Sequence, residues 1–407
     1  MNAYKKNARS GQPPVASARE QLESASYNWI MTNNLFGAPE TRRFLSGFWQ
    51  KRPMFARGVL PRLDRAIDRA RLIELACRDD VESRLVIGTR RAWRLEHGPF
   101  RRRDFAQLPP RNWTLLVNGV ENFVGAAREL QKRFRFVPYA RHDDVMVSYA
   151  APGGGVGPHY DSYDVFLLQG LGARRWQISD QQELALIEGV PLKILRRFRP
   201  QCEWNSQSGD LLYLPPNYAH HGVALGECIT WSLGFKAPSR QEMAGRFLDF
   251  LHDHLKLGGD YRDPGLTPQR HPAAIGKAML GQVSAMVNAI RWNQTDIVRC
   301  LGEYLTEPRA NLAFERMQRM PVAGFARLAR ARGIRLDLKS RMLFCGSMVF
   351  INGESVIANA ALRRVLRRLA DERGLPPGMP IERRVLDLLY RWYGAGYIKV
   401  GIESPNL

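Results

Sequence analysis

In the stretch GPHYDSYDVFLLQG, His159 stands two positions before Asp161. Successive side chains of a β-strand alternate between its faces, so on an extended strand both of these side chains point the same way. A third ligand is expected from residues 211–220, where an apolar strand and a Pro-Pro turn lead to His220. Two imidazoles and one carboxylate leave three positions of an octahedral metal free, which is typical of Fe(II) oxygenases. The pattern predicts an iron site, with the adjacent His221 as the alternative third ligand.

An arginine pair follows in the next predicted strand. Alternation places Arg174 on the same face as Trp176 and Ile178, whereas Arg175 faces the other way. A guanidinium inside an apolar barrel needs an anionic partner, and a carboxylate suits its planar donors. Because no acidic residue is evident on that face, we expect the partner to be a dicarboxylate co-substrate such as 2-oxoglutarate. The alternative is a buried ion pair with a carboxylate of the protein.

Other groups of polar residues and cysteines are weaker candidates for a functional site. The run His142-Asp143-Asp144 has the residue types of a metal site, but adjacent side chains diverge on a strand, so a surface charge run is expected. These carboxylates, together with Asp164 and Glu227, are candidates for pairing with a cationic ligand, and the alternative is that they are ordinary surface charges. The five cysteines lie far apart without a CxxC pair, which argues against a disulfide framework or a thiolate zinc site.

The elements that would position these residues change character along the chain. Residues 1–30 are polar and aperiodic, and we expect a disordered extension. Helices alternating with short strands lead into residues 141–238, where regularly spaced apolar runs and turn residues predict an antiparallel barrel or sandwich. The catalytic domain is therefore assigned to residues 31–238. A helical module at 239–307 and a winged-helix-like domain at 308–407 follow.

The apolar spacing in the helical module has its own consequence. Phe247, Leu248, Leu251 and Leu255 recur at helical intervals, and a second apolar stretch covers residues 275–290. This is more apolar helical surface than one barrel face would cover. We therefore expect a two-fold homodimer, formed through these helices or through the N-terminal module.

Composition and net charge indicate which partners and which cellular location the protein is expected to have. The chain has 407 residues and a formal net charge of +21. Such a basic balance favours polyanionic partners such as ribosomes or rRNA, although a solvated basic surface is the simpler reading. No apolar run approaches the ~20 residues that span a bilayer, and the polar start MNAYKKNARSGQPP lacks a signal-peptide pattern. We expect a cytoplasmic protein without membrane contact.

Six segments resemble those of the bacterial ribosomal oxygenases, which are cupin-type, JmjC-like proteins. The resemblance extends from about residue 35 to the end of the chain. The segments are FWQKRP (48–53), PGGGVGPHYDSYDVFLLQG (152–170), RRW (174–176), GDLLYLPPNYAHHG (209–222), LGFKAP (233–238) and LGGDYRDP (257–264).

The resemblance implies a mixed α+β fold with a double-stranded β-helix core, a helical dimerisation module and a C-terminal winged-helix-like domain. It implies an Fe(II)- and 2-oxoglutarate-dependent dioxygenase that hydroxylates an arginine of a large-subunit ribosomal protein. The alternatives are the same chemistry on a ribosomal histidine or another substrate, and a non-catalytic ribosome-assembly protein. The basic segment at 192–199 and the N-terminal extension depart from the family pattern, and both bear on the substrate.

The resemblance also implies roles for individual residues. Fe(II) would be held by His159, Asp161 and His220, and 2-oxoglutarate by Arg174. Ser148 and Ser232 match further co-substrate contacts, although either could be an ordinary buried strand residue.

Overall fold

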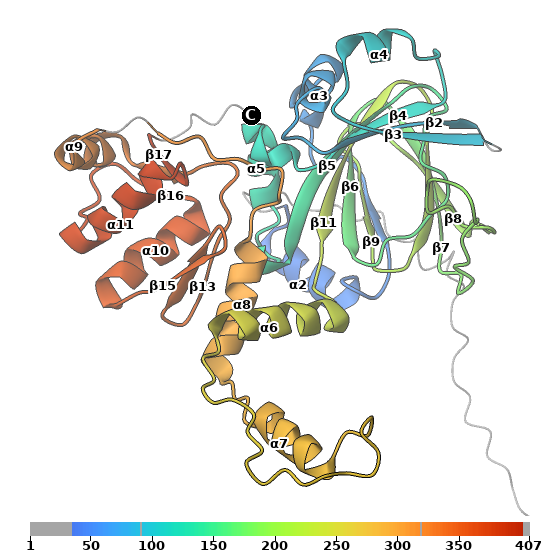
Figure 1. The fold of residues 1–407 in the computed structure, drawn as a ribbon. Coiled ribbons are helices and arrows are strands. Elements are labelled where there is room, and N and C mark those ends of the chain that lie inside the picture. Colours follow the sequence, from blue (N-terminus) through green and yellow to red (C-terminus); the bar gives the residue numbers. More distant parts are fainter. Residues whose placement is uncertain (1–34, 90–91, 318–319, 402–407) are drawn as a thin grey trace, which may run out of the picture. The chain divides into compact units, whose positions relative to one another are not determined.

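The computed structural model has the predicted mixed α+β composition (Figure 1). It describes residues 35–89, 92–317 and 320–401. The predicted extension over residues 1–30 therefore lies outside the described part of the chain. Among the described helices, none is long and apolar enough to cross a membrane.

Contacts divide the chain into two units. Among the described residues, the first runs to Ala237 and includes Ala310–Ala313, and the second comprises Pro238–Arg309 and residues 314–401. The first unit contains the predicted barrel region. The second contains both the helical module and the winged-helix-like region, so the boundary between 307 and 308 stays a prediction.

Two antiparallel sheets form the first unit. The larger has the order β1-β9-β6-β11-β5-β4-β2-β3, and the smaller has the order β10-β7-β8. Their strands are β1 (Met54–Ala56), β2 (Ser83–Thr89), β3 (Ala92–His97), β4 (Trp113–Val117), β5 (His142–Ala150), β6 (Asp164–Leu171), β7 (Arg174–Ser179), β8 (Cys202–Ser206), β9 (Leu211–Leu214), β10 (Ala219–Ala224) and β11 (Cys228–Phe235).

One face of the larger sheet packs in the hydrophobic core, and the other face lines a cavity. On β5, Val145, Val147 and Tyr149 belong to the main hydrophobic core. Residues of α2, α3 and α5 belong to the same core. The intervening β5 side chains line a cavity shared with β7 and β10. Alternation along one strand thus separates the core from the site. The helices of this unit are α2 (Ala38–Gly47), α3 (Arg69–Ala76), α4 (Arg102–Ala106) and α5 (Gly125–Lys132).

The second unit begins with three helices, α6 (Arg240–His254), α7 (Lys277–Asn288) and α8 (Gln294–Thr306). Helix α8 starts with a capping box between Asn293 and Asp296. It packs closely on β14, since a Cβ atom at Gly302 would lie only 2.4 Å from the ring of Phe350. Glycine therefore permits this helix to approach the β-ribbon.

The rest of the second unit contains two small sheets, β13-β14-β15 and β16-β12-β17, and three helices. Strands β13 and β14 form a hairpin in the region expected to be winged-helix-like. The elements are α9 (Val322–Arg332), β12 (Ile334–Leu336), β13 (Met342–Cys345), β14 (Met348–Ile351), β15 (Glu354–Ile357), α10 (Ala360–Glu372), β16 (Gly374–Leu375), α11 (Arg383–Gly394) and β17 (Ile398–Val400).

Candidate active site

The two predicted histidine ligands are joined through their backbones. His159 donates its N–H to the carbonyl of His220 at 3.0 Å and accepts the reciprocal bond at 2.8 Å. This is an isolated bridge between the β5–β6 connection and β10, so the expectation of a continuous strand through His159 and Asp161 is wrong. Gly157, with a φ of +80°, and Pro158 interrupt the strand just before the bridge. The bridge itself holds the two imidazoles side by side.

Backbone carbonyls orient both imidazoles. The Nδ1 atom of His159 lies 3.0 Å from the carbonyl oxygen of Gly157, and that of His220 lies 2.9 Å from the carbonyl oxygen of Tyr218. If each Nδ1 donates to its carbonyl, each Nε2 keeps a free lone pair. The carboxylate of Asp161 lies 3.7 Å from the Nε2 atom of His220. The ligand atoms of the three residues all lie within 4.8 Å of one another, which is a metal-binding arrangement.

Burial keeps His220 neutral. Its side chain is almost completely enclosed, and this burial, reinforced by the nearby His159, lowers the pKa of its imidazole to about 4. Asp161 opposes this shift. A neutral imidazole at physiological pH is the form that binds a metal. His221, the alternative ligand, is half-buried, lies outside the cluster, and packs edge-on against Phe198.

Arg174 is a buried cation without an acidic partner among the described residues. The alternation expected on β7 is confirmed, because Arg174, Trp176 and Ile178 are buried while the residues between them are partly exposed. The Nη2 atom of Arg174 donates to the sulfur of Cys228 at 3.6 Å, and its guanidinium lies 5.5 Å from the centre of the Trp176 ring. Its buried Nε has no hydrogen-bond partner. A buried guanidinium in this state calls for an anionic ligand.

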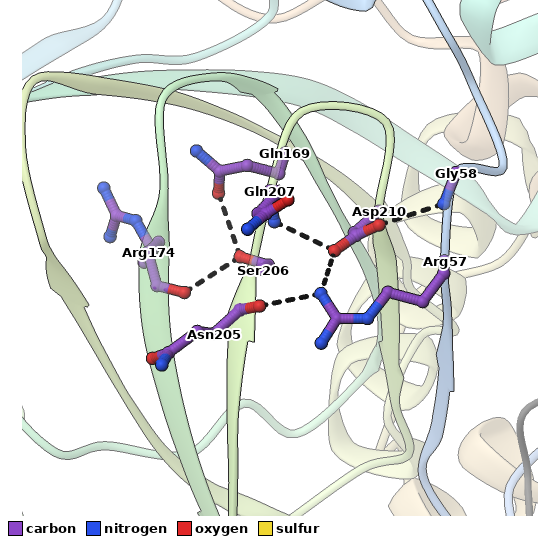
Figure 2. A network of polar contacts seen from close by, with 8 residues as sticks. All are labelled: Arg57, Gly58, Gln169, Arg174, Asn205, Ser206, Gln207 and Asp210. Atoms are coloured by element: carbon purple, nitrogen blue, oxygen red, sulfur yellow. Dashed lines mark hydrogen bonds and ion pairs between the residues drawn. The ribbon is translucent and has the colours of Figure 1, made fainter.

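A polar network fixes the backbone of Arg174 (Figure 2). Ser206 on β8 donates to the carbonyl of Arg174 at 3.0 Å and lies 3.3 Å from the side-chain oxygen of Gln169. Asp210 accepts hydrogen bonds from Arg57 at 2.6 Å and from the N–H of Gly58 at 2.9 Å. The guanidinium of Arg174 points away from this network, as Figure 2 shows. Ser206 thus holds the strand while leaving the charged group available.

The two predicted serines lie in the cavity wall. Ser148 and Ser232 are both buried and both line the cavity. The hydroxyl of Ser148 donates to the carbonyl of Thr230 at 3.4 Å, across the β5–β11 pair. Thr114 on β4 also lines the cavity, and its buried hydroxyl has no hydrogen-bond partner. The sequence interpretation missed Thr114, because a lone threonine in a strand has no distinguishing pattern.

The cavity has a volume of about 600 Å³ and extends beyond the histidines to a carboxylate on β5. Asp144 lines this part and is only 8% exposed. Its side chain accepts hydrogen bonds from the side chain of Asn118 at 3.1 Å and from the N–H of Gly119 at 3.2 Å. The expectation that this run forms a charged surface is therefore wrong for Asp144, and also for His142, which is buried as well. Both donors come from the connection after β4, which explains why the local sequence does not reveal this burial.

An aromatic ring stands beside the same part of the cavity. Tyr163 lines it, and a Cβ atom at Gly234 would lie 3.3 Å from its ring, so the ring rests closely on β11. Burial, together with the nearby carboxylate of Asp161, raises the pKa of the Tyr163 hydroxyl far above its usual range. Tyr163 therefore stays neutral and presents a flat, partly apolar surface.

The other two acidic candidates lie elsewhere. Asp164 is fully buried, accepts a hydrogen bond from Tyr213 at 2.6 Å, and pairs with Arg141 at 3.2 Å. Glu227 lies in the β10–β11 turn with its nearest cation, Arg69, at 3.9 Å. Neither residue lines the cavity, and the half-buried Asp143 does not line it either. Asp144 is thus the candidate that remains for recognising a cationic substrate.

The donor atoms suit a particular metal and co-substrate. Two imidazoles and one carboxylate match the preference of Fe(II) for mixed nitrogen and oxygen ligands, with positions left for other molecules. The orphaned Nε of Arg174 matches a carboxylate of 2-oxoglutarate. The residues present therefore fit both groups.

Comparison with known proteins gives independent information. The JmjC domain family matches residues 129–243, which include His159, Asp161, His220 and Arg174, and the ROXA-like winged-helix family matches residues 289–399. The chain is 34% identical over 270 residues to the Escherichia coli ribosomal protein uL16 3-hydroxylase, covering 66% of this chain and 72% of that protein. It is 38% identical over 228 residues to a probable ribosomal oxygenase of Haemophilus influenzae, covering 55% and 54% of the two chains.

Solved structures agree with these matches. The structure of YcfD, a ribosomal oxygenase from Escherichia coli, in complex with cobalt and 2-oxoglutarate, aligns with a TM-score of 0.74 and 29% identity. The alignment covers 88% of this chain and 97% of that one. The predicted JmjC/cupin core and winged-helix region are thereby confirmed.

Proposed function

Because this chain belongs to the bacterial ribosomal oxygenases, a JmjC family of 2-oxoglutarate-dependent dioxygenases, we propose that it hydroxylates an arginine of a large-subunit ribosomal protein. The name of the Escherichia coli relative makes uL16 the first substrate to test. The observation that carries the choice of arginine is the buried carboxylate of Asp144 in the cavity wall. A ribosomal substrate also implies a cytoplasmic location.

Each cavity residue has a role in this proposal. His159, Asp161 and His220 would hold Fe(II), and Arg174 would hold the distal carboxylate of 2-oxoglutarate. When bound, iron with 2-oxoglutarate and O₂ supplies the oxidation of an unactivated C–H bond, with release of succinate and CO₂. Ser148 and Ser232 would contribute further polar contacts to the co-substrate. The buried ring of Trp176 excludes water from the same space.

Asp144 and Tyr163 would bind the substrate arginine. A guanidinium binds a carboxylate through paired hydrogen bonds and stacks on an aromatic ring. Asp144 is fixed by two donors, so it meets an incoming cation in a preorganised position. A neutral imidazole gains less from this carboxylate, which favours arginine over the alternative substrate, histidine.

The direct test of the substrate is mass spectrometry of whole ribosomes. Ribosomal proteins from cells with and without the gene are compared by intact mass, and the modified residue is then located in peptides. We expect the gain of one oxygen atom on an arginine of one large-subunit protein. The same gain on a histidine would support the alternative, and identical masses in both strains would contradict the proposal.

The Asp144→Asn substitution tests substrate recognition. It keeps the size of the side chain but removes the charge, and losing a buried charge pair costs about 2–5 kcal/mol. We expect the KM for an arginine peptide to rise at least about tenfold, with the KM for 2-oxoglutarate unchanged. Glu227→Gln, which removes an exposed carboxylate outside the cavity, should leave both constants unchanged. Equal peptide KM values for Asp144→Asn and the unmodified enzyme would rule out this role.

The enzyme is further proposed to act as a homodimer through α7. Every residue of α7 is exposed, and one face carries an apolar row at i, i+1, i+4, i+7 and i+8. Such a face is normally covered by a partner. The row consists of Met279, Leu280, Val283, Met286 and Val287.

Leu280→Glu tests the dimer, because each subunit of a two-fold dimer would place a negative charge in the same apolar interface. Light scattering at micromolar concentration should give a dimer for the unmodified protein and a monomer for Leu280→Glu. Gln282→Glu adds the same charge beside the apolar row and should remain dimeric. A monomeric unmodified protein would refute the proposed assembly.

A further inference from the structure

Helix α10 in the winged-helix region has two sharply different faces. Val365, Leu366, Leu369 and Ala370 are buried in the core of the second unit. The rest of the helix surface is basic and includes two pairs of arginines, each pair separated by one helical turn. We call these residues the arginine stripe, and they are Arg363, Arg364, Arg367 and Arg368.

The arginine stripe is not neutralised by carboxylates. Among the described residues, Arg363, Arg364 and Arg368 form no ion pair and no side-chain hydrogen bond. Elsewhere in the same unit an arginine one turn from a carboxylate does pair, as Arg299 and Glu303 do on α8 at 2.8 Å. The acidic residues of α10 are confined to its last turn. Of the four arginines, Arg367 interacts electrostatically with Asp371, one turn further along the helix. Arg364 and Arg368 are exposed, so these two present unpaired positive charge to solvent.

One arginine of the stripe lies over an exposed aromatic ring. Arg367 donates to the carbonyl of Gly346 at 2.9 Å, and its guanidinium lies 5.1 Å from the centre of the Phe344 ring. Phe344 belongs to β13 and is 36% exposed. The β13–β14 hairpin thus adds a stacking surface beside the charged helix.

The charge extends beyond α10. Residues 289–399, which match the winged-helix family, contain 20 Lys and Arg residues against 10 Asp and Glu residues. On α9, Arg327, Arg330 and Arg332 are also exposed and form no ion pair within the described chain. The stripe therefore belongs to a unit with a positive field of its own.

We infer that the arginine stripe binds RNA through its phosphate backbone. The inference rests on the proposed function, because a ribosomal protein is met next to rRNA. Arginine binds phosphate through two parallel hydrogen bonds and stacks on aromatic groups, so four arginines on one helix, one of them over Phe344, suit a nucleic acid better than an acidic peptide. RNA binding by this unit would bring a basic enzyme to a basic substrate that would otherwise repel it.

The experiment uses the full-length enzyme and a short fluorescein-labelled RNA hairpin, with binding measured by anisotropy over a range of salt concentrations. The test variant is Arg364→Glu with Arg368→Glu, and the matched control is Arg103→Glu with Arg111→Glu. All four residues are exposed and form no ion pair in the described chain. We expect the test variant to bind at least about tenfold more weakly and to lose about 2 from the salt slope, since each phosphate contact contributes roughly 0.9.

Further measurements separate the outcomes. The variant Arg364→Gln with Arg368→Gln should show a smaller loss of binding, and equal unfolding temperatures would show that neither variant misfolds. Hydroxylation of a free peptide should be unchanged in the test variant. If no peptide or ribosomal protein is hydroxylated but RNA binding still depends on the stripe, the inference stands while the proposed function fails.

Four results would overturn the inference. The test variant could bind the hairpin as tightly as the unmodified enzyme. The control variant could lose as much binding as the test variant, and the stripe would then not be a specific site. A DNA duplex of the same sequence could bind as tightly as the RNA hairpin. A polyglutamate peptide could bind more tightly than RNA, which would make the partner an acidic protein.

Discussion

Purified Asp161→Ala enzyme, supplied with Fe(II), 2-oxoglutarate and substrate peptide, will release at least about 100-fold less succinate than the unmodified enzyme. Loss of a residue that only supports a metal ligand costs 10–100-fold in affinity or activity, so loss of a ligand should cost at least as much. Asp161 provides the carboxylate of the cluster, and the two imidazoles alone leave the charge of the metal uncompensated. The measurement is succinate release, accompanied by titration with Co(II) to follow metal affinity directly.

Matched histidine variants make this prediction selective. His159→Ala should behave like Asp161→Ala, whereas His221→Ala should keep its activity because His221 lies outside the cluster. Circular dichroism and unfolding temperatures should show that all three variants are folded. If Asp161→Ala retains turnover, the carboxylate ligand was assigned wrongly. If His221→Ala loses turnover while His220→Ala keeps it, the wrong histidine was assigned.

The second large effect is expected for Arg174→Ala, which should raise the KM for 2-oxoglutarate at least about tenfold. Leaving a buried charge without its partner costs about 2–5 kcal/mol, and 1.4 kcal/mol already changes affinity tenfold. Since Arg174 has no acidic partner within the described chain, its removal should not leave a protein carboxylate uncompensated, and the fold should survive. The KM of Arg174→Lys for 2-oxoglutarate should lie between those of the unmodified enzyme and Arg174→Ala, because an ammonium group keeps the charge but cannot form the paired hydrogen bonds.

Arg175→Ala is the control for position on the strand. Arg175 follows Arg174 on β7 but faces away from the cavity, so its loss should leave the KM for 2-oxoglutarate unchanged. Initial rates are measured over a range of 2-oxoglutarate concentrations with peptide held constant. A KM that is the same for Arg174→Ala and the unmodified enzyme would remove Arg174 from the co-substrate site.

The local sequence carried much of the information about the site. Arg174 shares a face with Trp176 and Ile178, because backbone geometry within one strand sets this relation. His159 and Asp161 lie only two residues apart, although their segment is not a continuous strand. The resemblance to the ribosomal oxygenases then supplied the class of chemistry, which periodicity alone does not contain.

Tertiary structure decided the relations that depend on distant segments. The choice between His220 and His221 comes from the backbone bridge to His159, which joins residues far apart in the chain. Asp144 is buried because donors from the connection after β4 reach its side chain. The isolation of Arg174 from carboxylates depends on all the strands packed around it. Burial and pairing are sums over contacts from the whole domain, so they arise only when the sheets close around the cavity.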